Sequence, residues 1–170
     1  MQFFHTLTHT ASRLTLALAT ALLLAPGFNA YAETPQPPTV DLSALPKLEP
    51  GWADLNPLRG NQAAIEIGRS AYNQTCARCH GPDADGSRSP APDLRRLGRS
   101  CGRVKDAALK QRCLSDVDYY FRYSVQNGKI KLGVEHMPPW DGILSPTVVW
   151  AIRTFIESKP YVPPKTSLSQ

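Results

Sequence analysis

The chain has 170 residues, with 19 Lys and Arg against 14 Asp and Glu, so its formal net charge at pH 7 is +5. This length suits one domain with extensions, and we find neither an internal repeat nor a second domain. Nucleic acid is not expected as a partner, because the N-terminal residues predict export.

The first 32 residues predict a signal peptide that is cleaved near Ala32. Residues 14–24 form an apolar run too short to span a bilayer, and Arg13 precedes it. Residues 30–32 (Ala-Tyr-Ala) supply the small side chains that signal peptidase accepts. The alternative is a buried or membrane-anchoring helix, which the Pro26-Gly27 break disfavours. Export would place the chain in an oxidising compartment, where unpaired cysteines are unusual.

Two segments follow the predicted cleavage site. Residues 33–60 are rich in proline and predict an extended lead, partly ordered at best, that could pack through Trp52 or Leu55. Asn61 can cap a helix over residues 62–74, with Ile65, Gly68 and Tyr72 on one face. The main domain is therefore expected at residues 61–160.

The second half of this domain predicts a long loop and further helices. Residues 81–103 read as loop and residues 104–113 as a short helical turn. Ser115 resembles the cap of a new helix, with Asp118 completing a capping box and Asn127-Gly128 closing it.

The last helix opens at Ser145 and Pro146 and ends at Pro160. Its apolar stripe consists of Val148, Ile152, Phe155 and Ile156. Residues 161–170 predict a flexible tail. Because we find no alternating strand pattern, the fold class is predicted to be all-α.

The motif CARCH at residues 76–80 carries the chemistry. Two thiols one helical turn apart, Cys76 and Cys79, can each form a thioether with one vinyl group of a haem, and His80 is then held beneath the iron. A thioredoxin-like dithiol would need a βαβ setting, which is absent. A zinc site with four thiolates (76, 79, 101 and 113) is the other alternative, but it is disfavoured by export and leaves His80 without a role.

The sixth iron ligand is predicted to be Met137. It is the only methionine after the signal peptide, and two prolines follow it and immobilise its backbone. A thioether is a neutral ligand that raises the reduction potential. The neighbouring His136 is the rival ligand; its other interpretation is an exposed histidine.

The remaining cysteines, Cys101 and Cys113, are predicted to form a disulfide, because the chain is exported and the other two cysteines are consumed by haem. The surrounding segment, residues 88–112, is basic, with eight Lys and Arg against two Asp. It is either an ordinary solvated surface or a patch that steers the protein onto an acidic partner.

These residues together resemble the class I cytochromes c over residues 61–157. The resemblance rests on Gly68, Tyr72, CARCH with Gly81, Pro92-Asp93-Leu94, Asn127-Gly128-Lys129 and Met137-Pro138. It implies the class I cytochrome c fold around one covalent haem c, with Gly68 and Tyr72 meeting Phe155 and perhaps Trp150. It also implies that the Pro92 carbonyl accepts from His80 Nδ1 and that Leu94 contacts the haem. That Pro92 is only a loop residue stays an alternative.

Three features are similar to the small cytochromes c that accept electrons from PQQ-dependent alcohol dehydrogenases: RGN at residues 59–61, the cysteine-bearing insert and MPPW at residues 137–140. This resemblance implies a soluble periplasmic monomer, not an enzyme, that passes single electrons from such a dehydrogenase to an oxidase or another cytochrome. The alternatives are a haem subunit of another periplasmic dehydrogenase or oxidase complex and a small haem enzyme with an open iron site.

Overall fold

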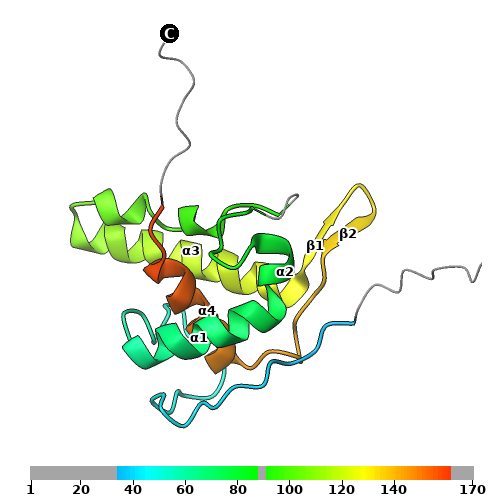
Figure 1. The fold of residues 1–170 in the computed structure, drawn as a ribbon. Helices are drawn as coiled ribbons and strands as arrows, with labels where there is room; N and C mark the ends of the chain where they lie inside the picture. Colours follow the sequence, from blue (N-terminus) through cyan, green and yellow to red (C-terminus); the bar gives the residue numbers. More distant parts are fainter. Residues whose placement is uncertain (1–33, 88–90, 162–170) are drawn as a thin grey trace, which may run out of the picture. The chain divides into compact units, whose positions relative to one another are not determined.

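The computed structural model describes residues 34–87 and 91–161 (Figure 1). The predicted signal peptide lies outside these residues, as do Arg88 and the predicted tail beyond Tyr161. Pro35 and the described residues after it belong to one unit.

The described residues form mostly helices, which confirms the predicted fold class. The helices are α1 (Gln62–Thr75), α2 (Ala77–His80), η2 (Leu94–Arg96), η3 (Cys101–Arg103), α3 (Ala107–Asn127) and α4 (Pro146–Ser158), and the strands are β1 (Lys129–Lys131) and β2 (Val134–Met137).

The crossing of α1 and α4 forms the centre of the fold. The Asn61 side chain caps α1 by accepting from the Ala64 N–H at 2.9 Å, as predicted. Gly68 lies against the backbone of α4, where a Cβ would overlap the Ala151 carbonyl. One turn later, the rings of Tyr72 and Phe155 pack with their centroids 5.1 Å apart. The small residue therefore lets the two helices approach closely.

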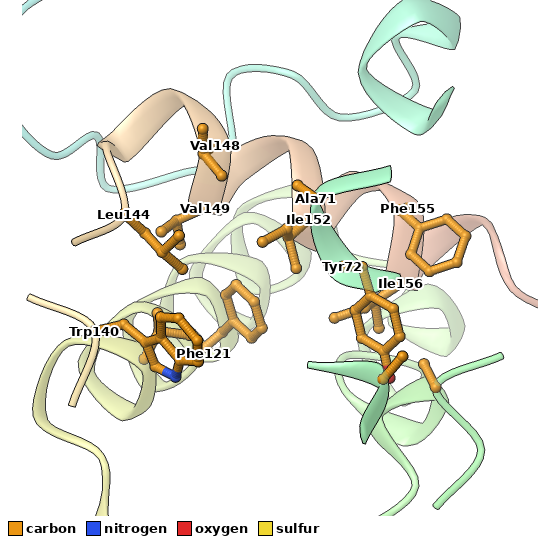
Figure 2. Close-up of a cluster of buried hydrophobic side chains, with 13 residues drawn as sticks. Ala71, Tyr72, Phe121, Trp140, Leu144, Val148, Val149, Ile152, Phe155 and Ile156 are labelled. Carbon is orange, nitrogen blue, oxygen red and sulfur yellow. The ribbon is translucent and has the colours of Figure 1, made fainter. Parts of the chain in front are cut away.

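A buried apolar cluster lies beside this crossing (Figure 2). It is built from α1, α3, α4 and the segment before α4, and its largest members are Tyr72, Phe121, Trp140, Ile152, Phe155 and Ile156. Ser145 and Pro146 open α4 as predicted, with the Ser145 side chain accepting from the Val148 N–H. The predicted stripe of α4 is buried in the cluster.

The prediction that a helix begins at Ser115 is wrong. Asp106 caps α3 by accepting from the Leu109 N–H at 2.8 Å, and the helix runs unbroken through position 115. Asp118 is not a cap residue because its carboxylate is buried and paired with Arg59 and Arg153. The end of α3 at Asn127-Gly128 is as predicted.

The antiparallel hairpin β1–β2 was not predicted. Its two-residue turn has positive φ at Leu132 (51°) and Gly133 (77°), the backbone of a type I′ turn. Leucine rarely adopts this conformation, and the strands are too short to show an alternating pattern. The hairpin ends at Met137, so it positions that residue.

The lead of residues 34–60 contains neither helix nor strand, has turns at residues 43–44 and 57–60, and packs on the helices. Leu45 and Leu58 are buried with the N-terminal half of α4, and Trp52 meets Trp150 edge to face at 6.0 Å. Trp150 thus packs against the lead.

Candidate functional site

The CARCH segment forms one tight helical turn at the end of α1. The Cys76 N–H donates to the Tyr72 carbonyl, and the His80 N–H donates to the Cys76 carbonyl at 3.0 Å. Neither Cys76 nor Cys79 is in a disulfide; Cys76 is half-buried and Cys79 is exposed. The turn therefore presents two thiols one turn apart, which is the spacing that attachment to two vinyl groups requires.

The surroundings of Cys76 favour the neutral thiol over the thiolate. Burial raises its pKa to about 11, against the opposing effect of the Thr75 hydroxyl, which lies 3.3 Å from the Cys76 sulfur. Nucleophilic and disulfide-exchanging cysteines have lowered pKa values instead. The local environment thus disfavours the dithiol alternative.

His80 is held in one orientation. Its Nδ1 lies 3.0 Å from the Pro92 carbonyl oxygen, the acceptor that the class I resemblance implied. Burial lowers the pKa of His80, although the Pro92 carbonyl opposes that shift. A neutral imidazole that donates through Nδ1 has its Nε2 lone pair free, which is the form in which histidine binds a metal.

Between His80 and Leu94, the described residues 81–87 and 91–94 lie against each other. The Tyr72 hydroxyl donates to the Gly81 carbonyl at 2.8 Å, and the Leu94 N–H donates to the Ala84 carbonyl at 2.8 Å. Leu94 packs against the apolar cluster, whereas Pro92 contributes its carbonyl to His80. The role of the Tyr72 hydroxyl was missed in the sequence because a buried tyrosine gives no sign of its partner.

Met137 and His136 differ in their surroundings. Met137 is half-buried and packs against the same apolar cluster as Cys76 and Leu94, while His136 is exposed. The register pairs Lys129 with Met137 and Ile130 with Glu135, so His136 is the extra residue of a bulge. The structure therefore brings the thioether, and not the second imidazole, to the cluster.

The segment around Met137 is held from both sides. On one side, a Cβ at Gly128 would overlap the Met137 carbonyl and lie 2.8 Å from the Pro138 carbonyl carbon. On the other, the Trp140 N–H donates to the Val125 carbonyl at 2.9 Å. The sequence identified Gly128 only as a helix end, because the residue that it contacts, Met137, lies nine positions further along the chain.

The other two cysteines argue against a zinc site. Cys101 and Cys113 form a disulfide with a Cα–Cα distance of 5.6 Å, so they are not available as zinc ligands. Within residues 34–87 and 91–161, no group of three or more His, Cys, Asp or Glu could hold a metal ion. Nor does this part of the chain contain a helix long and apolar enough to cross a membrane.

The donor set fits a covalent haem. The Cys76 thiol and the Met137 thioether border one apolar cluster, and the turn that begins at Cys76 also carries a second thiol and an imidazole with an oriented Nδ1. Apolar surroundings, thioether attachment and these two axial ligand types are what a c-type haem requires.

Comparison with known proteins gives an independent result. Residues 63–156 match the family model described as cytochrome c oxidase, cbb3-type, subunit III. The chain is 39% identical over 126 residues to cytochrome c550 of Pseudomonas aeruginosa, covering 72% of this chain and 77% of that protein. No solved structure matches. The chain belongs to the cytochrome c family, and it is an electron-transfer protein with covalently bound haem c rather than an enzyme.

Proposed function

We propose that this cytochrome carries one electron at a time on a single haem attached to Cys76 and Cys79, with His80 and Met137 as the axial ligands. The observation that supports this most is the position of Met137 and Cys76 against one apolar cluster, with His80 oriented by Pro92. The haem supplies the one-electron chemistry when bound. The chain's own residues attach it, orient His80 and keep water from the cluster.

The axial ligand can be tested by spectroscopy. The ferric holoprotein should show the sulfur-to-iron charge-transfer band, and Met137→Ala should lose it and lower the reduction potential, since a thioether favours ferrous iron. His136→Ala is the matched control and should leave the band and the potential unchanged, because that side chain is exposed. A wild type that lacks the band and whose spectrum and reduction potential change in His136→Ala but not in Met137→Ala would reverse the assignment.

The proposed electron donor is a PQQ-dependent alcohol dehydrogenase, and the proposed acceptor is an oxidase or another cytochrome. The support is the resemblance to the acceptors of such dehydrogenases, together with the basic surface of η2, η3 and the start of α3. Arg96, Arg99 and Arg103 line a hollow there with Ser100 and Tyr161, and the Arg99 guanidinium lies 4.9 Å from the Tyr161 ring centre. Clustered arginines without carboxylates among the lining residues favour an acidic partner surface.

The partner is tested by mixing the oxidised holoprotein with a PQQ alcohol dehydrogenase and its alcohol at low and high salt. Fast haem reduction that slows with salt is expected, because screening weakens attraction between exposed charges. No reduction, in a protein that ascorbate still reduces, would leave the electron carrier and reject this donor.

The proposed location is the periplasm, with the signal peptide cleaved near Ala32, and the proposed state is a soluble monomer. Mass spectrometry of the exported holoprotein should give an N-terminus at Glu33 and the mass of one haem. A stable heteromer on size-exclusion chromatography would instead favour the haem-subunit alternative.

A further inference from the structure

The ion pair of Asp93 and Arg95 lies next to the carbonyl that orients His80. The Pro92 carbonyl, whose oxygen lies 3.0 Å from His80 Nδ1, belongs to the peptide unit that ends at the Asp93 nitrogen. The Asp93 side chain also caps η2, because it accepts from the Arg95 N–H at 3.0 Å. The orientation of this peptide unit is therefore coupled to the contacts that hold the Asp93 side chain.

Arg95 binds the Asp93 carboxylate with two nitrogens. Its Nε lies 3.0 Å from one carboxylate oxygen, and its Nη2 lies 2.9 Å from the other. Both side chains are only 19% exposed. The hydrogen bonds from Arg95 hold the pKa of the Asp93 carboxyl below its ordinary value, so the carboxylate stays ionised at neutral pH. A bidentate pair of this kind fixes the orientation of the carboxylate, and a lysine, which is a point charge, cannot reproduce it.

Arg95 is also anchored to the segment that follows α4. Its Nη1 donates to the Pro160 carbonyl at 3.4 Å, and its guanidinium carbon lies 5.8 Å from the centre of the Tyr161 ring. The next residue, Arg96, approaches the same ring at 6.0 Å but is exposed. Arg95 therefore acts within the fold, as a link between Asp93 and the C-terminal segment.

Gly86 packs directly against the same peptide unit. A Cβ added to Gly86 would lie 2.8 Å from the Asp93 nitrogen and 3.1 Å from the Pro92 carbonyl carbon. The Gly86 N–H donates to the His80 carbonyl at 2.9 Å. The peptide unit thus lies against a residue that is itself bonded to His80, and the ion pair with Arg95 adds the side-chain contact that holds it there.

We propose that the ion pair of Asp93 and Arg95 positions the Pro92 carbonyl against the proximal histidine ring and thereby lowers the reduction potential. The inference rests on the proposed function, in which His80 binds the iron. A carbonyl that accepts from Nδ1 makes the imidazole more electron-rich, and an electron-rich ligand stabilises ferric iron relative to ferrous iron. Loosening this hydrogen bond should therefore raise the reduction potential.

The test compares Arg95→Lys with Arg69→Lys in the full holoprotein. Lysine keeps the positive charge but loses the two-nitrogen contact, so a changed potential cannot come from a changed net charge. Arg69 is the matched control, because it pairs with Glu66 in an exposed ion pair within α1. Two properties are measured for each protein: the exchange rate of the His80 Nδ1–H by NMR of the ferrous form, and the reduction potential.

Arg95→Lys is expected to speed exchange of the Nδ1–H about tenfold, because the carbonyl that protects it is held less firmly. Its reduction potential should rise, while its sulfur-to-iron band should keep the wild-type strength. Arg69→Lys should match the wild type in all three measurements. If Arg95→Lys has the wild-type exchange rate and potential, the proposal is overturned, even where the variant is less stable to denaturant, since the ion pair would then be purely structural.

The outcomes separate this inference from the proposed iron ligands. The haem ring current should strongly shift the His80 ring protons of the ferrous wild type, and unshifted protons would reject His80 as a ligand and overturn both proposals. Shifted protons together with equal exchange rates would keep the ligand and reject the role of the ion pair. A wild type without the sulfur-to-iron band would reject Met137 alone, and faster exchange in Arg95→Lys would still support the ion pair.

Discussion

At the residue scale, Gly128 controls the position of Met137. Its backbone has φ 66° and ψ −161°, a region that is essentially restricted to glycine, and its α-carbon faces the Met137 carbonyl. The glycine thus serves two purposes at once, since it ends α3 and makes room for the segment that carries the proposed ligand.

Gly128→Ala should therefore weaken the proposed bond between Met137 and the iron. The overlap and the backbone strain are expected to lower the free energy of unfolding by about 1–3 kcal/mol and to reduce the sulfur-to-iron band. Gly133→Ala is the matched control, because Gly133 also has positive φ but a Cβ added there would meet no atom within 4 Å. A full-strength band in both variants would contradict this role of Gly128.

At the scale of elements, the crossing of α1 and α4 depends on one small residue. Gly68 is buried against the Ala151 backbone, and a main-chain carbonyl cannot move aside as a flexible side chain can. The same crossing brings Tyr72 to Phe155 and its hydroxyl to Gly81, and so it supports the turn that contains His80.

Gly68→Ala should separate the helices and lower the free energy of unfolding of the holoprotein by about 1–3 kcal/mol. Gly102→Ala in η3 should change it by less than about 0.5 kcal/mol, since nothing lies within 4 Å of the added Cβ and its φ is not left-handed. Chemical denaturation followed by circular dichroism measures both. Equal stability of the two variants would show that the helices adjust at no cost.

A second element contact is the disulfide that joins η3 to α3. It closes a loop between Cys101 and Cys113, a sequence separation of 12 residues. Replacing both cysteines with serine should lower the free energy of unfolding by about 3 kcal/mol, because the unfolded chain regains the entropy of the open loop. Titration of the denatured holoprotein should find no free thiol before reduction; about two free thiols at that stage would contradict the bond.

At the scale of the whole molecule, a buried ionic network ties the lead to two helices. The Asp118 carboxylate of α3 accepts from Arg59 of the lead at 2.6 Å and from Arg153 Nε of α4 at 3.2 Å. The Asn56 N–H donates to the same carboxylate at 2.8 Å. Arg153 Nη2 lies 3.1 Å from the nearest Glu157 oxygen without the alignment of a hydrogen bond, and Arg153 Nη1 has no hydrogen-bond partner among the described residues. Asp118 is therefore the main counter-charge of a fully buried guanidinium.

Asp118→Ala should lower the free energy of unfolding by about 3–5 kcal/mol, because it leaves Arg153 buried and poorly compensated. Asp116→Ala, an exposed position of the same helix, should have an effect below about 0.5 kcal/mol. If the alanine variant does not fold, Asp118→Asn keeps the shape and should show a smaller loss. Denaturant midpoints that are equal for positions 116 and 118 would show that the network adds no stability.

The lead illustrates what the sequence leaves open. Its prolines predict a segment without helix or strand periodicity, but nothing local shows that Leu58 and Trp52 cover α4. Those contacts join residues about a hundred positions apart, and they depend on the surface that α4 presents once it has crossed α1.

The sequence by itself determined the parts whose signals are local. Caps at Asn61 and Ser145, the spacing of CARCH and the apolar stripe of α4 each act within a few residues, so they predicted α1, α4 and the haem-attachment turn. Only the tertiary structure decided the start of α3, the hairpin and the packing of the lead. Ser115 and Asp118 form a credible local cap, yet the ion pairs of Asp118 reach 59 and 35 residues along the chain. Breaking a buried ion pair costs more free energy than losing a local cap, which is worth about 1 kcal/mol. No pattern in the residues around Asp118 reveals its distant partners.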